Sequence, residues 1–334
     1  MTGRGDEEGG AMIAGGTRRW SHGLALGLAA VATAGCYASW SDVGDADAGD
    51  DAGAARDDAA ADRADDAGSS DVGDADVYCH SGTNPCPPGT VLVPCGPFVM
   101  GSDPGEGDLD EEPEHVLELS AFCIDAAEVT NGAYAACVTA GHCTPPGSSA
   151  SATRPSYFGN PTYDGFAMVN VNWYQADTYC AWVGKRLPTQ AEWEKAARGG
   201  CDLRTPASCG PEDEPTYPWG EAEPTCDRAN FVGCVGDVDR AAARPAGAGP
   251  YDAPDLVGNV QEWVADWYLG TAYDACRLGG CVDPTGPAMG SEKVFRGGHW
   301  ESVPGYLRAA NRFRQDPGFF DYHTGFRCAL SIRP

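Results

Sequence analysis

The sequence has few positive charges. Lys and Arg together number 22 against 49 Asp and Glu, and only three of the 22 are lysine, so the formal net charge is −27. A chain of this charge repels phosphate backbones, and no basic stripe interrupts the excess of carboxylates. We therefore exclude nucleic acid as a partner.

The N-terminal region has an apolar stretch, but one too short to cross a bilayer. It covers residues 24–34, follows two arginines and precedes Cys36. Because a spanning helix needs about 20 apolar residues, this pattern indicates an export signal. Residues 34–36 resemble the end of a bacterial lipobox, which predicts lipidation of Cys36; an ordinary signal peptide cleaved near Ala34 is the alternative. We expect an exported lipoprotein, periplasmic or at the cell surface, and Tyr37 favours the outer membrane.

The fifteen cysteines include no Cys-x-x-Cys pair, which argues against zinc ribbons and thioredoxin-like redox sites. So many cysteines without metal spacing are typical of an oxidising compartment. With Cys36 lipidated, fourteen remain, enough for seven disulfides. The short-range pairs that we expect are Cys201 with Cys209, Cys226 with Cys234, and Cys276 with Cys281.

Aromatic residues are absent from residues 41–77, which hold thirteen aspartates and two arginines among Ala and Gly. Such a segment cannot bury enough apolar surface to offset the entropy of the chain. We expect a signal peptide over 1–36, a disordered tether over 37–77, and one globular domain over 78–334.

Local patterns in the globular part predict three helices and several short strands. Thr189 and Glu192 form a capping-box pattern, which predicts a helix over 190–198 that ends at Gly199. The other two helices have as inward residues Ala176, Tyr179, Cys180 and Val183 within 172–183, and Tyr134, Cys137 and Val138 after Thr130. Strands are expected within 97–102, 121–130, 293–300 and 324–330. The fold class is α+β.

The order of motifs resembles one known family. FVMGS (98–102), EVTNGAY (128–134), GKRLPTQAEWEKAARGG (184–200), DLVGNVQEW (255–263), FRGGHW (295–300) and GFRCAL (325–330) are similar to the formylglycine-generating enzyme, or sulfatase-modifying factor, family. The resemblance covers roughly residues 91–330. It implies an elaborated C-type-lectin-like fold with little regular secondary structure, and a disulfide between Cys180 and Cys328. A second family bridge falls near Ala196 and Ala309, so it is lost.

The resemblance does not extend to the family's catalytic centre. The founding enzymes oxidise a sulfatase cysteine to formylglycine with copper(I), held by two thiolates between the RGG and GFR motifs. Residues 299–324 contain no cysteine, and Ser302 falls near the first expected thiolate. A hydroxyl is a poor ligand for soft copper(I), so copper and the oxidase activity are not expected. A rearranged oxidase, with His299, Ser302 or Trp263 as catalytic candidates, is the alternative.

Histidine spacing also argues against an iron centre, because no two of the six histidines are three or four residues apart.

A ligand cleft for an extended peptide or an anionic glycan is one hypothesis. It would use Trp263, Arg296, His299, Trp300, Arg308, Arg312 and Arg314. The alternative is that the rings are core anchors and the arginines balance local carboxylates.

The resemblance further implies calcium. One site would use Asn259 with backbone carbonyls of residues 258–262, among them Val260 and Glu262, and a second would use Asn230 with Asp237 or Asp239. The acidic run 103–114 lacks the EF-hand spacing, and we expect a solvated loop there.

Together these features predict an exported, calcium-supported module that binds or scaffolds an unidentified protein or glycan at the cell envelope. The membrane would be contacted through the lipid anchor alone. An oxidase with a rearranged site and a surface module without a ligand remain the alternatives.

Overall fold

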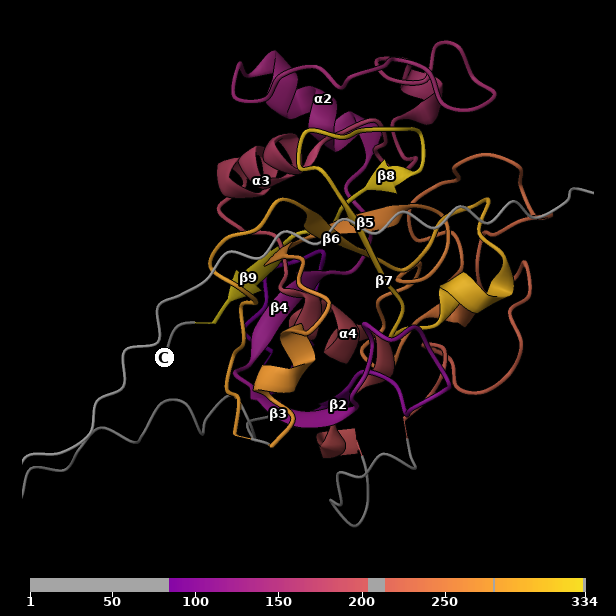
Figure 1. The fold of residues 1–334 in the computed structure, drawn as a ribbon. Coiled ribbons are helices and arrows are strands. Elements are labelled where there is room, and N and C mark those ends of the chain that lie inside the picture. The colour runs from indigo at the N-terminus through magenta and orange to yellow at the C-terminus, as the bar shows by residue number, and fades with distance from the viewer. Residues whose placement is uncertain (1–83, 204–213, 279, 333–334) are drawn as a thin grey trace, which may run out of the picture. The chain divides into compact units, whose positions relative to one another are not determined.

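The structure is a computed structural model that describes residues 84–203, 214–278 and 280–332. The predicted signal peptide, lipidation site and tether lie outside these residues. Within them, no helix is both long and apolar enough to cross a membrane. The domain is rich in loops and short 3-10 turns, and it holds three α-helices and nine strands in the described part (Figure 1).

The three predicted helices are confirmed, and each begins at a polar cap. They are α2 (Asn131–Thr139), α3 (Trp173–Trp182) and α4 (Gln190–Arg198). At α4 the Glu192 amide donates to Thr189 Oγ1 over 3.1 Å and the Thr189 amide donates to Glu192 Oε2 over 2.8 Å, so the capping box forms as predicted. Gly199, with φ of +92°, ends the helix. Val183 is 38% exposed and does not share the buried face of α3, because that helix ends one residue earlier.

The strands form three small sheets. One contains β1 (Thr90–Val93), β4 (Phe122–Asp125) and β9 (Ala329–Ser331), all antiparallel in that order. A second pairs β2 (Gly96–Met100) with β3 (His115–Leu119). The third has the order β7 (Arg312–Gln315), β6 (Lys293–Arg296), β5 (Gln261–Trp267) and β8 (Thr324–Gly325), with β8 parallel to β5. The sequence patterns did not predict β1, β3, β5 or β7.

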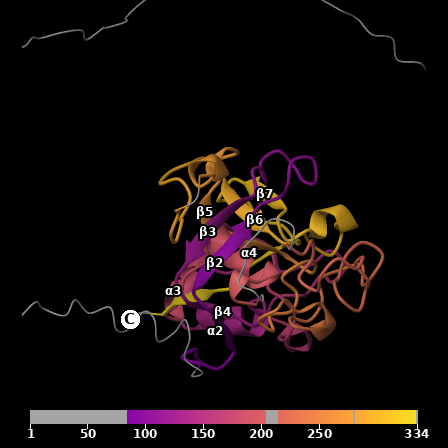
Figure 2. The same cartoon turned by 90° about the horizontal axis from the view of Figure 1, so that it is seen from below.

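Helix α4 lies at the centre of the domain. All nine of its residues are buried, and the view from below shows β2 beside it, with β3 next to β2 (Figure 2). A helix buried on every side must satisfy its charged side chains inside the protein. Lys195 does so by donating to the carbonyls of Pro94 and Gly96, over 2.7 and 2.9 Å.

Disulfides hold the loops between these elements. The pair that the resemblance implied, Cys180 with Cys328, joins α3 to the segment before β9. The short pairs Cys226–Cys234 and Cys276–Cys281 also form as expected, whereas Cys209 lies outside the described residues. Two further bridges, Cys86–Cys123 and Cys137–Cys143, were not predicted.

The acidic run 103–114 is not simply a solvated loop. Glu111 within it is fully buried, and its carboxylate accepts hydrogen bonds from Arg308, Ser102 and Asn311. The expectation was wrong for this residue because two of its partners, Arg308 and Asn311, lie 197 and 200 residues away in the chain, where local charge patterns give no sign of them.

Candidate functional site

Two glycines directly after β6 set the direction of the chain as it enters the candidate site. Gly297 and Gly298 have φ of +92° and +67°, in the left-handed region that favours glycine. A Cβ on Gly297 would collide with the carbonyl oxygen of Leu256, and one on Gly298 would lie 2.7 Å from that of Tyr306. The backbone is thus packed on both sides, and His299 leaves it at a fixed position.

His299 lies beside a second histidine, His323, which directly precedes β8 in the sequence. Their ring centroids are 4.0 Å apart, and the ring of Trp300 lies 5.2 Å from that of His323. Tyr322 completes the group, with its ring 4.4 Å from that of His323. We call these four side chains the histidine–aromatic cluster.

Two carboxylates hold His323 in place. Its Nδ1 lies 3.1 Å from Asp321 Oδ2, and its Nε2 lies 3.1 Å from Glu301 Oε2. Burial alone would raise the pKa of Asp321, but hydrogen bonds from His323 and Thr324 lower it, so Asp321 is ionised. The Glu301 side chain is 57% exposed, and this carboxylate is open to a ligand.

His299 is a neutral imidazole at physiological pH. Burial, and then the neighbouring His323, lower its pKa to about 4. Its Nδ1 accepts the amide proton of Glu301 over 3.2 Å, which places the ring proton on Nε2 in this tautomer. His299 is therefore built into a turn as well as into the cluster.

Ser302 supports that turn rather than offering a free hydroxyl. It is 4% exposed, and its Oγ accepts the His299 amide over 3.0 Å. Its carbonyl oxygen accepts the Val232 amide over 3.1 Å, so the loop 231–236 is tied to the turn.

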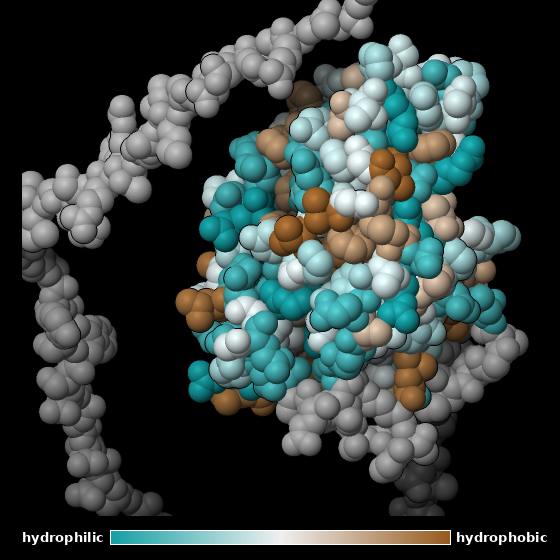
Figure 3. Space-filling model, turned by 90° about the vertical axis from the view of Figure 1, so that its right-hand side faces the viewer, coloured by the Kyte–Doolittle hydropathy of each residue, from teal (hydrophilic) through white to brown (hydrophobic). Residues whose placement is uncertain are grey.

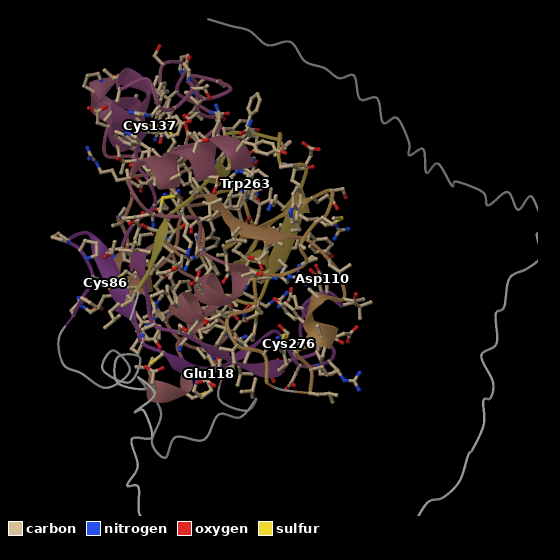
Figure 4. The ribbon with its side chains drawn as sticks, turned by 90° about the vertical axis from the view of Figure 1, so that its left-hand side faces the viewer. Cys86, Asp110, Glu118, Cys137, Trp263 and Cys276 are labelled. Atoms are coloured by element: carbon tan, nitrogen blue, oxygen red, sulfur yellow. A yellow bond between two sulfur atoms is a disulfide. The ribbon has the colours of Figure 1, made fainter. Side chains whose placement is uncertain are left out.

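The predicted ligand cleft does not assemble. Trp263 is fully buried, donates from its indole to the Val171 carbonyl over 3.0 Å, and lies in the interior near α3 (Figure 4). Arg296 is also fully buried, where it binds Glu194 and three backbone carbonyls of residues 309–311. Both residues serve the core, so only His299 and Trp300 of the predicted set belong to the candidate site.

The other predicted arginines are engaged in ion pairs and hydrogen bonds elsewhere. Arg308 forms a two-pronged pair with Glu111, and it lines a separate hollow of about 330 Å³ together with Arg198 and four acidic side chains. Arg312 donates to backbone carbonyls of Asp110 and Leu269, and Arg314 pairs with Glu292. The cluster thus has no arginine among the predicted set to attract an anionic ligand.

Apolar side chains surround the turn of His299. Val232 and Val235 of the loop 231–236, and Val303 and Tyr306 after Ser302, are each between 44% and 51% exposed. The face of the domain that carries the turn Pro304–Leu307 shows apolar side chains gathered near its middle (Figure 3). An exposed apolar group beside a polar cluster is typical of an interaction surface.

The predicted calcium ligands have protein partners. The Asn259 side chain donates to Glu128 and accepts from Asn230 and from the Asp239 amide, over 2.8 to 3.2 Å. Asp239 binds Arg244, over 2.8 Å. Asp237 is bound by Ser151, Thr153 and Arg154.

Glu262 is fully buried in a further network. Its carboxylate accepts from the Trp193 indole over 2.8 Å and from Arg327 Nε over 2.9 Å. The side chains of this predicted set therefore do not present free ligands, although Glu128 Oε2 nearby is buried without a hydrogen-bond partner in the described part. No group of three or more His, Cys, Asp or Glu that suits a metal ion occurs among the described residues. Calcium binding stays a prediction.

Thiol chemistry lacks a reactive group in the described residues. All twelve cysteines there are in disulfides. The interval 299–324, where the thiolates of the family's enzymes lie, holds the histidine–aromatic cluster instead. Sequence reasoning missed His323, Asp321, Glu301 and Tyr322 in this role, since only folding brings residues 299 and 323 together.

Comparison with known proteins agrees with the motif order. The model of the sulfatase-modifying factor enzyme 1-like domain matches residues 79–332. The serine/threonine-protein kinase pkn1 of Chlamydia caviae is 35% identical over 264 residues, which are 73% of this chain but 38% of that protein. The chain thus spans well under half the length of this relative. The formylglycine-generating enzyme of Streptomyces coelicolor is 34% identical, and the match covers 72% of this chain and 88% of the enzyme.

Solved structures give the same fold. PvdO from Pseudomonas aeruginosa is 25% identical with a TM-score of 0.56, over 73% of this chain and 94% of PvdO. Treponema denticola variable protein 1 is 22% identical with a TM-score of 0.55, over 72% and 94%, and this likeness bears on the fold alone. The α+β fold predicted from the motifs is confirmed, and the chain belongs to the family of sulfatase-modifying factor enzyme 1-like domains.

Proposed function

We propose that this protein is a binding module at the cell envelope and not a copper oxidase. The observation that carries the proposal is the chemistry of residues 299–324, which contain no cysteine, together with the disulfide pairing of every described cysteine. Copper(I) oxidation of a thiol needs soft thiolate ligands, and imidazole and carboxylate groups occupy that position here. Fold membership alone does not supply the missing ligands.

The surface that we assign to binding consists of the histidine–aromatic cluster with the exposed valines and Tyr306 around it. Tyr322 is 40% exposed and offers a ring face, with the buried Trp300 behind it, and Glu301 offers an exposed carboxylate. Aromatic rings beside a carboxylate attract cationic groups, and the predicted cleft arginines are occupied elsewhere. These features favour a basic, partly apolar polypeptide segment over an anionic glycan.

The position at the envelope follows from the N-terminal sequence. Lipidation of Cys36 would attach the chain to a membrane, most simply the outer membrane, and residues 37–77 would hold the domain away from the headgroups. A structural calcium ion is part of the same proposal and would bind near Asn259, where Glu128 Oε2 is buried without a hydrogen-bond partner.

An oxidation assay tests the main claim. The full chain is incubated with a Cys-x-Pro-x-Arg peptide, copper(I) and oxygen, and the peptide mass is read, with the Streptomyces coelicolor enzyme in parallel as a positive control. We expect an unchanged mass. Conversion of the cysteine to formylglycine by this chain would overturn the proposal and direct attention to other copper ligands.

A binding assay tests the surface. Fluorescent peptides that alternate Lys with Tyr, or Glu with Tyr, are titrated with wild-type protein, Glu301→Gln and Glu292→Gln. We expect the basic peptide to bind more tightly than the acidic one, and Glu301→Gln to weaken it several-fold. Glu292→Gln, on another exposed carboxylate, is the matched control. Equal binding of both peptides, or equal effects of both variants, would refute this role of Glu301.

A further inference from the structure

A small cavity lies where α4, β3, β5 and the turn Ala272–Ala275 meet, and it shares no residue with the histidine–aromatic cluster. Its volume is about 30 Å³. Four polar side chains line it, and each is 5% exposed or less: His115, Gln190, Asp266 and Tyr273. Apolar neighbours such as Met100 and Leu117 complete the walls. A polar interior in so apolar a place needs an explanation.

Three of these side chains have atoms that no described residue satisfies. They are Gln190 Oε1, Asp266 Oδ1 and the Tyr273 hydroxyl. Folded proteins pair nearly all buried polar atoms, with protein groups or with ordered water. Three residues that line one cavity thus carry an unpaired atom each, which indicates that the cavity contains a ligand.

The donor and acceptor properties of the three atoms define that ligand. The side-chain oxygen of Gln190, Oε1, can only accept. The backbone amide of Gln190 donates to Asp266 Oδ2 over 2.8 Å, which leaves Asp266 Oδ1 as a second acceptor. The Tyr273 hydroxyl can donate. The ligand must therefore donate two hydrogen bonds and accept one, as a water molecule does.

Size and charge agree with this chemistry. A cavity of about 30 Å³ has room for a water molecule but not for a larger organic ligand. The Asp266 carboxylate in the lining would attract a cation, but the Arg312 guanidinium, 4.4 Å from the centre of the Tyr273 ring, already supplies a positive charge beside these residues. A neutral ligand is favoured.

We propose that this cavity holds one ordered water molecule, which donates to Gln190 Oε1 and Asp266 Oδ1 and accepts from the Tyr273 hydroxyl. The water would join the turn Ala272–Ala275, which directly precedes the Cys276–Cys281 disulfide, to the first residue of α4 and to β5. Gly286 also lines the cavity, and a Cβ there would lie 2.9 Å from Asp266 Oδ1. A side chain at this position would therefore press on the atom that the water binds.

Crystallography of the full chain tests the proposal directly. We expect one density peak at hydrogen-bond distance from the three oxygens, without an anomalous signal after a rubidium soak. Absence of the peak, or direct hydrogen bonds among the three side chains, would overturn the proposal. An anomalous peak would replace the water with a monovalent cation and would overturn it too.

Water relaxation dispersion in solution gives an independent readout. Tyr273→Phe removes one of the three partners, and Tyr268→Phe, whose hydroxyl binds Asp110 on a partly exposed side, is the matched control. We expect the long-lived water signal of Tyr273→Phe to fall by one molecule or to shift to a shorter residence time. An unchanged signal in Tyr273→Phe would count against the proposal, and the wild-type crystal decides if the variant does not fold.

Discussion

The buried ion pair between Glu194 of α4 and Arg296 of β6 allows a sharp test of how the core is held together. Both side chains are fully buried. The Glu194 carboxylate also accepts from the Gly101 amide over 2.8 Å and from Arg198 over 3.0 Å. Arg296 donates to the carbonyls of Ala309, Ala310 and Asn311. The variant Glu194→Gln keeps the shape and removes the negative charge.

The expected loss follows from the burial of the charge that remains. In Glu194→Gln, Arg296 stays ionised without a compensating anion, and breaking a buried pair in this way costs about 3 to 5 kcal/mol. Glu292→Gln breaks the ion pair with Arg314. The Arg314 side chain is 48% exposed and the Glu292 side chain 40%, and exposed pairs contribute about 0 to 1 kcal/mol to stability. The two variants differ in burial and share the same chemical change.

Unfolding in guanidinium chloride without reductant, followed by tryptophan fluorescence, measures both losses. The disulfides stay intact in both proteins, so the difference in the free energy of unfolding reports the buried charge of Glu194 and its pairs with Arg296 and Arg198. Equal losses in the two variants would refute the reasoning. Arg296 would then not depend on Glu194, and its assignment to the core rather than to a ligand would lose its main support.

Three further predictions concern other parts of the domain. Burial raises the pKa of Asp266 to about 6, above the ordinary 3.8, so the folded state holds this proton more tightly than the unfolded state. Stability should fall by about 2 kcal/mol as the pH rises from 4 to 6, and Asp266→Asn, with His115, Arg312 and Lys293 still in place, should flatten this slope in unfolding curves at pH 4, 5, 6 and 7. Removing the Cys180–Cys328 bridge with two alanines should lower the free energy of unfolding by about 4 to 5 kcal/mol, more than removing Cys226–Cys234, because it closes a longer loop; the reverse ranking in denaturant titrations would contradict this. Thr189→Ala should cost about 1 kcal/mol through loss of the α4 cap, and Thr139→Ala at the exposed end of α2 should cost much less; thermal melts that show equal losses would argue against the cap.

Features that depend on neighbouring residues could be predicted from the sequence. The α4 capping box needs only Thr189 and Glu192, which are three residues apart, and it forms as expected. The short disulfides Cys226–Cys234 and Cys276–Cys281 likewise follow from proximity in the chain, although Cys137–Cys143, which are six residues apart, were not recognised as a pair. The family and the Cys180–Cys328 pair came from motif order, which carries information about the whole fold.

Features that depend on distant partners could not be predicted. An arginine at the end of a strand has the same sequence pattern whether it faces a ligand or the core, and Arg296 is placed in the core by Glu194, 102 residues away. In the same way, Glu111 in an acidic run is buried by Arg308. The strands β5 and β7 were missed because neither shows a clear alternation, and each is fixed by pairing with β6.

The network of Trp193, Glu262 and Arg327 has a consequence for how proteins of this kind are classified. Each residue belongs to a different one of the motifs that identify the family, and the three meet in one fully buried set of hydrogen bonds. These motifs are therefore required by the buried hydrogen-bond network of the core, which we call the frame. Residues 299–324 lie outside this network, so histidines and aromatic rings can replace thiolates there without disturbing it. A match to the motifs reports that the frame is intact and carries no information on whether the chemistry has been kept.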